Sequence, residues 1–377
     1  MRHLYVPLAK NRCMFGVRLS EIPLPVAGRD REGLIDWIIE TFNLVRRRKD
    51  TNSHQLAMSP IHRILRDYFL SHPKIGVDSN QLAEDFALTP AAIHHHMNRL
   101  MRAGLVTSSK GQGWRKYFLR GGSISTAISY FCMQARHVMK QRMREMKEFW
   151  TEPEHAHEIL FSGEIMPSVT IQLAEWQPQK EEYSKLSQFA EDIGLLGERP
   201  GKEILANSTS DYLLRELFAQ RTISLDEVAE GIDRAKSQRI LERFRQTGVV
   251  ERVPRIDRLS TAIWSAATTQ FQRRGEEWLS KKGGFQRLEV SDEMLESIKE
   301  GKLTPELTES FLESMTVERK MLLLNLLGGS LANGYRLCGS TNEMVERKMS
   351  DHLERILRRI QRVGDMLEKD NSNSTTQ

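Results

Sequence analysis

The segment from Thr89 to Arg120 has the composition of a surface that meets an anion. It holds six basic side chains and three histidines within thirty-two residues, and no carboxylate. A face that meets only water ordinarily mixes charges of both signs, so this segment predicts contact with a polyanion such as DNA. A second segment, from Arg234 to Arg258, carries eight basic residues against three acidic ones.

Helical spacing divides the first basic segment into an inner and an outer face. A helix that begins after the N-cap Thr89 and ends at Gly104 would bury Ile93 and Met97 and turn a polar set outward, because successive residues point about 100° apart. A glycine-containing basic hairpin follows, and its cations suit phosphate contacts. The predicted DNA-contacting residues are Ala91, His95, Asn98, Arg99, Arg102, Lys110, Arg115 and Lys116.

The second basic segment gives a smaller and less sharply defined set. Here Asp233 is the expected N-cap of a helix that runs from Arg234 to Thr247 and stops before Gly248. The accessible candidates on this helix are Arg234, Lys236, Arg239 and Arg243.

The elements that position the first set form a compact unit. The pattern predicts helices over Ser59–Ser71 and Ser79–Phe86, then the helix capped by Thr89. Two short strands, Leu105–Thr107 and Tyr117–Leu119, are expected on either side of the basic hairpin. The hairpin holds Gly111 and Gly113, and its Trp114 is expected to pack beneath it.

The same order of elements returns later in the chain. Helices are expected over Tyr212–Phe218, Leu225–Gly231 and Arg234–Thr247. The tetrapeptide Ser-Thr-Ala-Ile occurs after each copy, at 125–128 and at 260–263, where it would open a long helix. On this alignment the second hairpin is nine residues shorter than the first, and the preserved order predicts an internal duplication.

Residues 59–119 resemble the winged helix-turn-helix domain of ArsR-like and MarR-like prokaryotic regulators. The resemblance rests on SNQLAEDFALTPAAIHHHMNRLMRAGLV and the basic hairpin after it, and extends more loosely to residues 211–259. It implies a winged-helix fold, reading of the major groove by the third helix and, frequently, a dimer. The cysteine motif of arsenic-type sensors is missing, so metal sensing is not implied.

The predicted fold class is mainly α: tandem winged helix-turn-helix units of three helices and a short hairpin, with long connecting helices and a helical C-terminal region. The expected divisions are an N-terminal segment with one helix (1–56), the first winged helix (57–123), a long helix and connector (124–208), the second winged helix (209–260), a helix (261–282), an acidic helical region ending in a short coiled coil (283–368) and a disordered tail (369–377).

Other chemistries find little support in the sequence. The three cysteines are far apart, which argues against a disulfide framework, and the adjacent His94, His95 and His96 point in different directions, so they do not suit one metal ion. No phosphate-binding loop, HExxH or GxSxG motif occurs. We therefore expect a protein that is not an enzyme and that has no metal site and no cofactor.

The sequence also predicts the partners and the cellular compartment of the chain. Without a signal peptide or a span of about 20 apolar residues, the chain is expected in the cytoplasm with double-stranded DNA and without a membrane. A seven-residue repeat suits either a homodimer or packing on the chain's own domains; its members are Met349, Leu353, Ile356, Ile360, Val363 and Leu367. The rival function is a protein-interaction scaffold with degenerate winged helices in a transcription or chromosome-maintenance complex.

Overall fold

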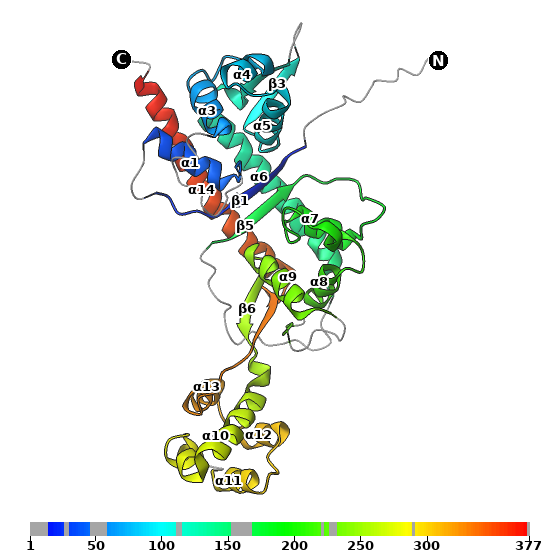
Figure 1. Cartoon of the computed structure of the whole chain (residues 1–377), viewed down its shortest axis with the longest axis vertical. Coiled ribbons are helices and arrows are strands. Elements are labelled where there is room, and N and C mark those ends of the chain that lie inside the picture. The colour runs from blue at the N-terminus through cyan, green and yellow to red at the C-terminus, as the bar shows by residue number, and fades with distance from the viewer. Residues whose placement is uncertain are drawn as a thin grey trace.

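The computed structural model describes residues 14–25, 30–45, 59–110, 115–151, 168–219, 222–225, 232–288 and 291–374. In this part of the chain the protein is mainly helical, with small antiparallel sheets (Figure 1). Every helix described there is too short or too polar to span a lipid bilayer.

A two-stranded sheet lies near the middle of the larger body (Figure 1). Its strands are β1 (Gly16–Ser20) and β5 (Thr170–Ala174). Buried and partly exposed residues alternate along β1, and along β5 as far as Leu173, as expected when one face packs on a core. Arg18 pairs with Gln172 at the centre of the ladder, and Glu21 N–H donates to the Val169 carbonyl at one end. The ladder is therefore symmetric about the Arg18–Gln172 pair.

Two long antiparallel helices cover the buried face of this sheet. They are α6 (Ile124–Met146) and α14 (Asn342–Ser374), and a short turn, η3 (Lys147–Phe149), follows α6. Ser125 Oγ donates to Asp365 Oδ1 over 3.1 Å near one end of the pair, and Lys147 Nζ lies 3.2 Å from Glu343 Oε1 near the other. The two helices therefore lie side by side and run in opposite directions.

The seven-residue repeat of the C-terminal helix is occupied within the chain. Its six apolar members are all at most 2% exposed and belong to the same hydrophobic core as α6. Ile128 of α6 lies so close to Gly364 that a Cβ there would approach Ile128 Cδ1 to 2.5 Å. In the structure, the repeat packs on α6 of its own chain.

The first unit has the expected helices and strands, and one strand more. Its elements are α1 (Arg31–Thr41), α3 (Pro60–Ile64) continued by the π-helical turn η1 (Leu65–Leu70), β2 (Val77–Asp78), α4 (Ser79–Asp85), α5 (Pro90–Arg102), β3 (Val106–Lys110), β4 (Arg115–Leu119) and η2 (Arg120–Gly122). The sheet order is β2-β4-β3, so the short strand before α4 joins the hairpin. The N-terminal segment contributes β1 as well as the single helix expected there.

The described elements of the second unit follow the same order. Its elements are α7 (Lys185–Asp192), η4 (Gly201–Ile204), α8 (Thr209–Phe218), α9 (Arg234–Gln246), β6 (Val250–Pro254) and β7 (Asn333–Leu337). The expected helix over Leu225–Gly231 falls almost wholly outside the described residues. An isolated bridge joins Ile223 to Tyr335, in the place where Val77 pairs with Tyr117 in the first unit.

The predicted closure of the second hairpin before Ser260 is wrong. Strand β6 pairs with β7, and Val250 lies opposite Leu337 as Val106 lies opposite Leu119. Residues 255–332 therefore stand where the first hairpin has residues 111–114. The shared tetrapeptide misled the alignment, because local sequence does not reveal which distant strand completes a sheet. The structural counterpart of α6 is α14.

The inserted residues form a module with its own hydrophobic core (Figure 1). Its elements are η5 (Ile256–Arg258), α10 (Leu259–Lys281, interrupted at Gly275), η6 (Phe285–Arg287), α11 (Ser291–Lys299), α12 (Pro305–Phe311) and α13 (Val317–Leu326). The boundary expected at 260 thus lies close to the start of this module, whereas 282 falls inside the module and 368 falls inside α14. The tail expected to be disordered from residue 369 instead continues α14 to Ser374, and residues 375–377 lie outside the described part.

Candidate nucleic-acid interface

Local features of the sequence determine where helix α5 begins and ends. Thr89 Oγ1 accepts the Ala92 N–H over 3.3 Å, Pro90 occupies the first turn, and Gly104 takes a left-handed φ of 72° after the last turn. Ile93, Met97 and Leu100 are fully buried. One face is thus fixed on the core, and the opposite face carries the polar residues.

The structure places most of the predicted α5 contacts on that outer face. Ala91, His95 and Arg102 are exposed, and Asn98 is half-buried. The helix therefore presents a small residue near its start, an imidazole and an amide along its length, and a guanidinium at its end. That arrangement suits close approach to base edges followed by contact with phosphate.

Arg99 departs from the outward set. Its Nη2 donates to the Asn43 carbonyl over 2.9 Å, and the side chain is half-buried. Asn43 has a left-handed φ of 49° in the turn after α1. Helical spacing alone could not reveal this bond, because the carbonyl comes from a turn 56 residues away. Arg99 fixes the end of α5 to the N-terminal segment.

The basic hairpin is described only at its base. Lys116 is exposed and Arg115 is half-buried on β4, next to the short strand β2. Lys110 is the last residue of β3 and pairs with Arg115. Gly111, Gly113 and Trp114, expected at the tip and beneath it, lie outside the described residues.

The second predicted set is partly engaged by neighbouring groups. Arg234 and Arg239 are exposed on α9. Lys236 Nζ lies 2.5 Å from Glu203 Oε1, and Arg243 Nη1 donates to the Leu196 carbonyl over 2.8 Å. Arg243 thus corresponds to Arg99, because Arg99 binds a carbonyl in the turn after α1 and Arg243 binds one in the turn after α7.

The three adjacent histidines of α5 lie in different environments. His94 Nδ1 lies 3.3 Å from the Tyr117 hydroxyl, His95 is exposed, and His96 is half-buried. Burial lowers the pKa of His96, and the nearby His95 and Arg99 lower it further. Among the described residues no group of His, Cys, Asp and Glu is arranged to hold a metal ion.

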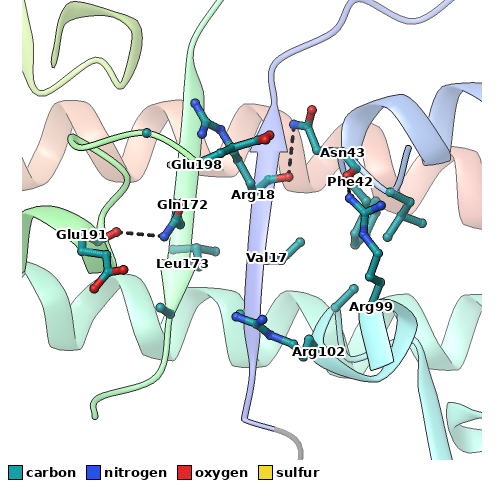
Figure 2. A pocket seen from close by; sticks show the side chains of 15 residues that line it. Val17, Arg18, Phe42, Asn43, Arg99, Arg102, Gln172, Leu173, Glu191 and Glu198 are labelled. Atoms are coloured by element: carbon teal, nitrogen blue, oxygen red, sulfur yellow. Dashed lines mark hydrogen bonds between the residues drawn. The ribbon is translucent and has the colours of Figure 1, made fainter. Parts of the chain in front are cut away.

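The strand β1, which lies beside α5, was not predicted from the sequence. Arg18 and Gln172 lie at the centre of the β1–β5 ladder, and the Arg102 guanidinium lies against Gly16. Figure 2 shows the side chains of Arg18, Gln172 and Arg102 in front of the strands, with α6 and α14 behind. The alternation Val17, Arg18, Leu19 was the available signal for β1, but nothing local indicated its partner.

Comparison with known protein families, curated proteins and solved structures finds no match for the chain.

Proposed function

We propose that the chain is a DNA-binding transcriptional regulator with two winged-helix units, of which the first reads DNA through α5. The first unit has three helices, a short strand before the second helix and a terminal hairpin, which supports the proposal. In the second unit α8, α9 and the β6–β7 pair follow the same order, an isolated bridge at Ile223 stands in place of the short strand, and the second helix is not described. Support for DNA as the ligand comes from the exposed polar face of α5 and the basic hairpin, in a segment without carboxylates.

The proposal rests on the positions of α5 and α9, because arginines near the ends of both helices lie near the β1–β5 sheet. Arg99 and Arg102, near the end of α5, line the face of the β1–β5 sheet opposite α6 and α14. Arg243, near the end of α9, contacts Gly197, which lines the same face. One chain therefore places the ends of α5 and α9 beside one sheet, as the proposal requires.

This arrangement supplies in one chain what a symmetric dimer supplies in two. Gly104 after α5 lies against Phe15 and Gln134, and Gly248 after α9 lies against Val169 and His352 in the same way. We infer that the two halves arose by duplication and that the α6–α14 pair replaces a dimer interface. Because α5 and α9 carry different side chains, the two half-sites would differ in sequence.

A titration of fluorescently labelled random duplex tests DNA binding directly. Anisotropy at ~50 and ~200 mM salt should show a steep loss of affinity, because phosphate contacts release counterions. Mass photometry of the complex should find one chain per duplex. A chain that does not bind duplex even at ~50 mM salt would contradict the proposal, and two chains per site would contradict the single-chain arrangement.

Two variants separate the roles of the helix and the hairpin. Lys116→Ala should weaken binding to all sequences and reduce the salt slope by about 1, because it removes one phosphate contact. Asn98→Ala should instead reduce the preference for the best sequence by about 1–3 kcal/mol. Lys302→Ala is the matched control, because Lys302 is exposed on the inserted module and should leave both quantities unchanged.

A second candidate function, protein interaction, is favoured for the second unit alone. Lys236 is paired with Glu203, and the hairpin opens into the module, whose residues 283–315 carry eight carboxylates against three basic residues. That charge would repel a phosphate backbone. If the second unit serves a protein partner, Arg239→Ala should leave DNA affinity unchanged while Arg102→Ala lowers it.

A further inference from the structure

A cavity of about 400 Å³ opens on the sheet face between α5 and the turns that follow α1 and α7 (Figure 2). Strands β1 and β5 form its floor. Residues 42–44 line one side, and Glu191, Gly197 and Glu198 line the other. Both halves of the chain therefore contribute walls, and the cavity lies at the centre of the symmetric ladder.

The lining is rich in guanidinium groups. Arg18, Arg99 and Arg102 line the cavity together with Glu191 and Glu198, and Arg243 lies near enough to Arg18 to act on it electrostatically. Burial lowers the pKa of Arg18, Glu198 acts to raise it and Arg243 to lower it. Positive charge thus exceeds negative charge around a partly desolvated space, which favours an anion.

Hydrogen bonds between neighbouring residues hold the walls of the cavity in place. Asn43 Nδ2 donates to Ser20 Oγ over 2.8 Å, and Gln172 Nε2 donates to the Glu191 carbonyl over 2.8 Å. Arg102 is exposed, and its Nη2 would lie 2.9 Å from a Cβ at position 16. Gly16 therefore gives this guanidinium room to lie across the strand.

We propose that this cavity binds a small organic anion, a carboxylate or phosphate ester of metabolite size, with Arg102 and Arg18 as its principal ligands. Guanidinium groups bind carboxylate and phosphate through paired, charge-assisted hydrogen bonds. The volume falls in the range of small-molecule sites, which begins at about 300 Å³. Such a ligand would bind between Arg102 on α5 and Arg18 at the centre of the ladder.

Calorimetric titration of the full chain without DNA, in low-salt buffer free of phosphate, tests the site. Citrate and glucose 6-phosphate are the two anionic probes, and glucose is the neutral control. At least one anion should bind saturably, with one site per chain, and glucose should not bind. Arg102→Ala should weaken that binding at least about tenfold, because it removes a charge-assisted donor.

Arg319→Ala on α13 is the matched control, because it removes an exposed arginine outside the cavity and should not change anion binding. Absence of saturable binding by both anions, or equal binding by Arg102→Ala and the unchanged chain, would overturn the proposal. It would also be overturned if Arg102→Ala weakened duplex binding while neither anion bound, since the arginines would then serve DNA phosphate. Failure of duplex binding alone would leave the anion result standing.

Discussion

Glu21 follows β1 and is only 8% exposed. Its carboxylate accepts from Arg355 Nε over 3.0 Å and lies 3.5 Å from His352 Nδ1, both on α14. Burial acts to raise the pKa of Glu21, but the bonds from His352 and Arg355 outweigh it and lower the pKa to about 2. The carboxylate therefore stabilises the fold fully above its ordinary pKa of 4.5, and that contribution is lost as the pH falls towards 2.

Glu21→Gln should accordingly lower the free energy of unfolding by about 1–3 kcal/mol near pH 7, because charged hydrogen bonds are lost. The difference from the unchanged chain should shrink at about pH 3. Urea denaturation at the two pH values measures it. Glu309→Gln, at an exposed position on α12, should show no such difference. An equal loss at both pH values would contradict the assigned pKa.

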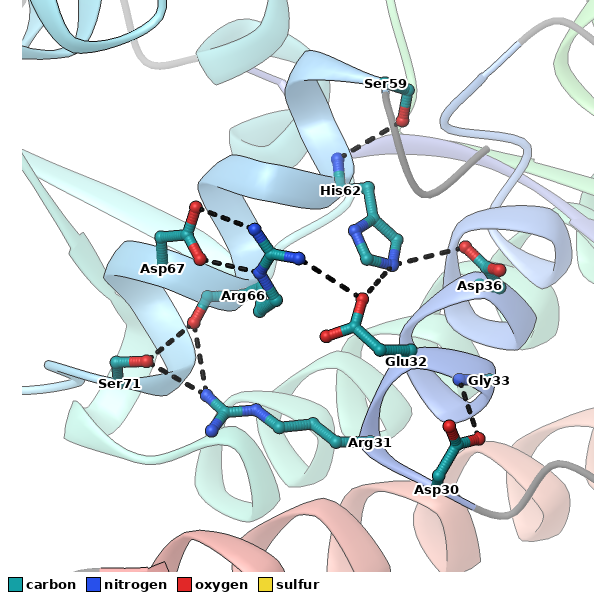
Figure 3. A network of polar contacts seen from close by, with 10 residues as sticks. All are labelled: Asp30, Arg31, Glu32, Gly33, Asp36, Ser59, His62, Arg66, Asp67 and Ser71. Carbon is teal, nitrogen blue, oxygen red and sulfur yellow. Dashed lines mark hydrogen bonds and ion pairs between the residues drawn. The ribbon is translucent and has the colours of Figure 1, made fainter. Parts of the chain in front are cut away.

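His62 lies fully buried between α3 and α1 (Figure 3). Its Nε2 is 3.3 Å from Asp36 Oδ1 and 3.5 Å from Glu32 Oε2, and Arg66 also faces Glu32. Burial lowers the pKa of His62 and outweighs Glu32, which acts to raise it. The folded state therefore favours the neutral imidazole, so the stabilisation is present above the ordinary pKa of 6.5 and is lost as the pH falls below it.

The free energy of unfolding should consequently fall between about pH 7 and pH 5 more steeply for the unchanged chain than for His62→Gln. Denaturant titrations across that range measure the two slopes. His72→Gln is the matched control, because His72 is exposed. Identical slopes for all three proteins would show that His62 does not titrate with unfolding.

At the scale of elements, the α6–α14 pair determines how the two halves meet. Leu353 is 2% exposed in the shared core, whereas Met344, earlier on α14, is 42% exposed. Leu353→Ala should destabilise the chain by about 2–5 kcal/mol through lost burial and a cavity, and Met344→Ala should have little effect. Thermal unfolding measures both.

The concentration dependence of the same thermal unfolding distinguishes packing of α14 within one chain from packing between two chains. Because α14 packs on α6 of its own chain, the unfolding midpoint should not change with protein concentration. A midpoint that rises with concentration, and a Leu353→Ala effect that disappears on dilution, would instead indicate that the apolar face of α14 packs between separate molecules.

Element boundaries in the first unit could be predicted because their signals are local. Thr89, Pro90 and Gly104 define α5, and the apolar spacing within it defines the buried face. The outward placement of Ala91, His95 and Arg102 followed from the same spacing. Arg99 could not be placed in this way, because its partner is a carbonyl in another part of the chain.

At the scale of the whole molecule, the inserted module is expected to fold independently of the body. The apolar core of residues 259–331 is separate from the main core, and both ends of the insert leave from the paired strands β6 and β7. Replacing residues 258–330 by Gly-Gly should therefore leave cooperative unfolding of the body intact.

Circular dichroism and denaturant titration of the shortened chain, beside the isolated module, measure this outcome. The shortened chain should keep the helical signal of the body, and the module should show a helical signal and unfold cooperatively. Loss of cooperative unfolding in the shortened chain would show that the module and the body form one folding unit.

The sequence by itself determined the helices of the first unit, the cap of α9, the charge of the candidate interface and the apolar repeat of α14. All of these depend on residues within a few turns of one another. Only the tertiary structure decided that β6 pairs with β7, that β1 pairs with β5, and that α14 packs on α6. Those pairings join segments far apart in the chain. The local sequence of a strand or of an apolar helix face is compatible with several partners, so it does not specify which one is used.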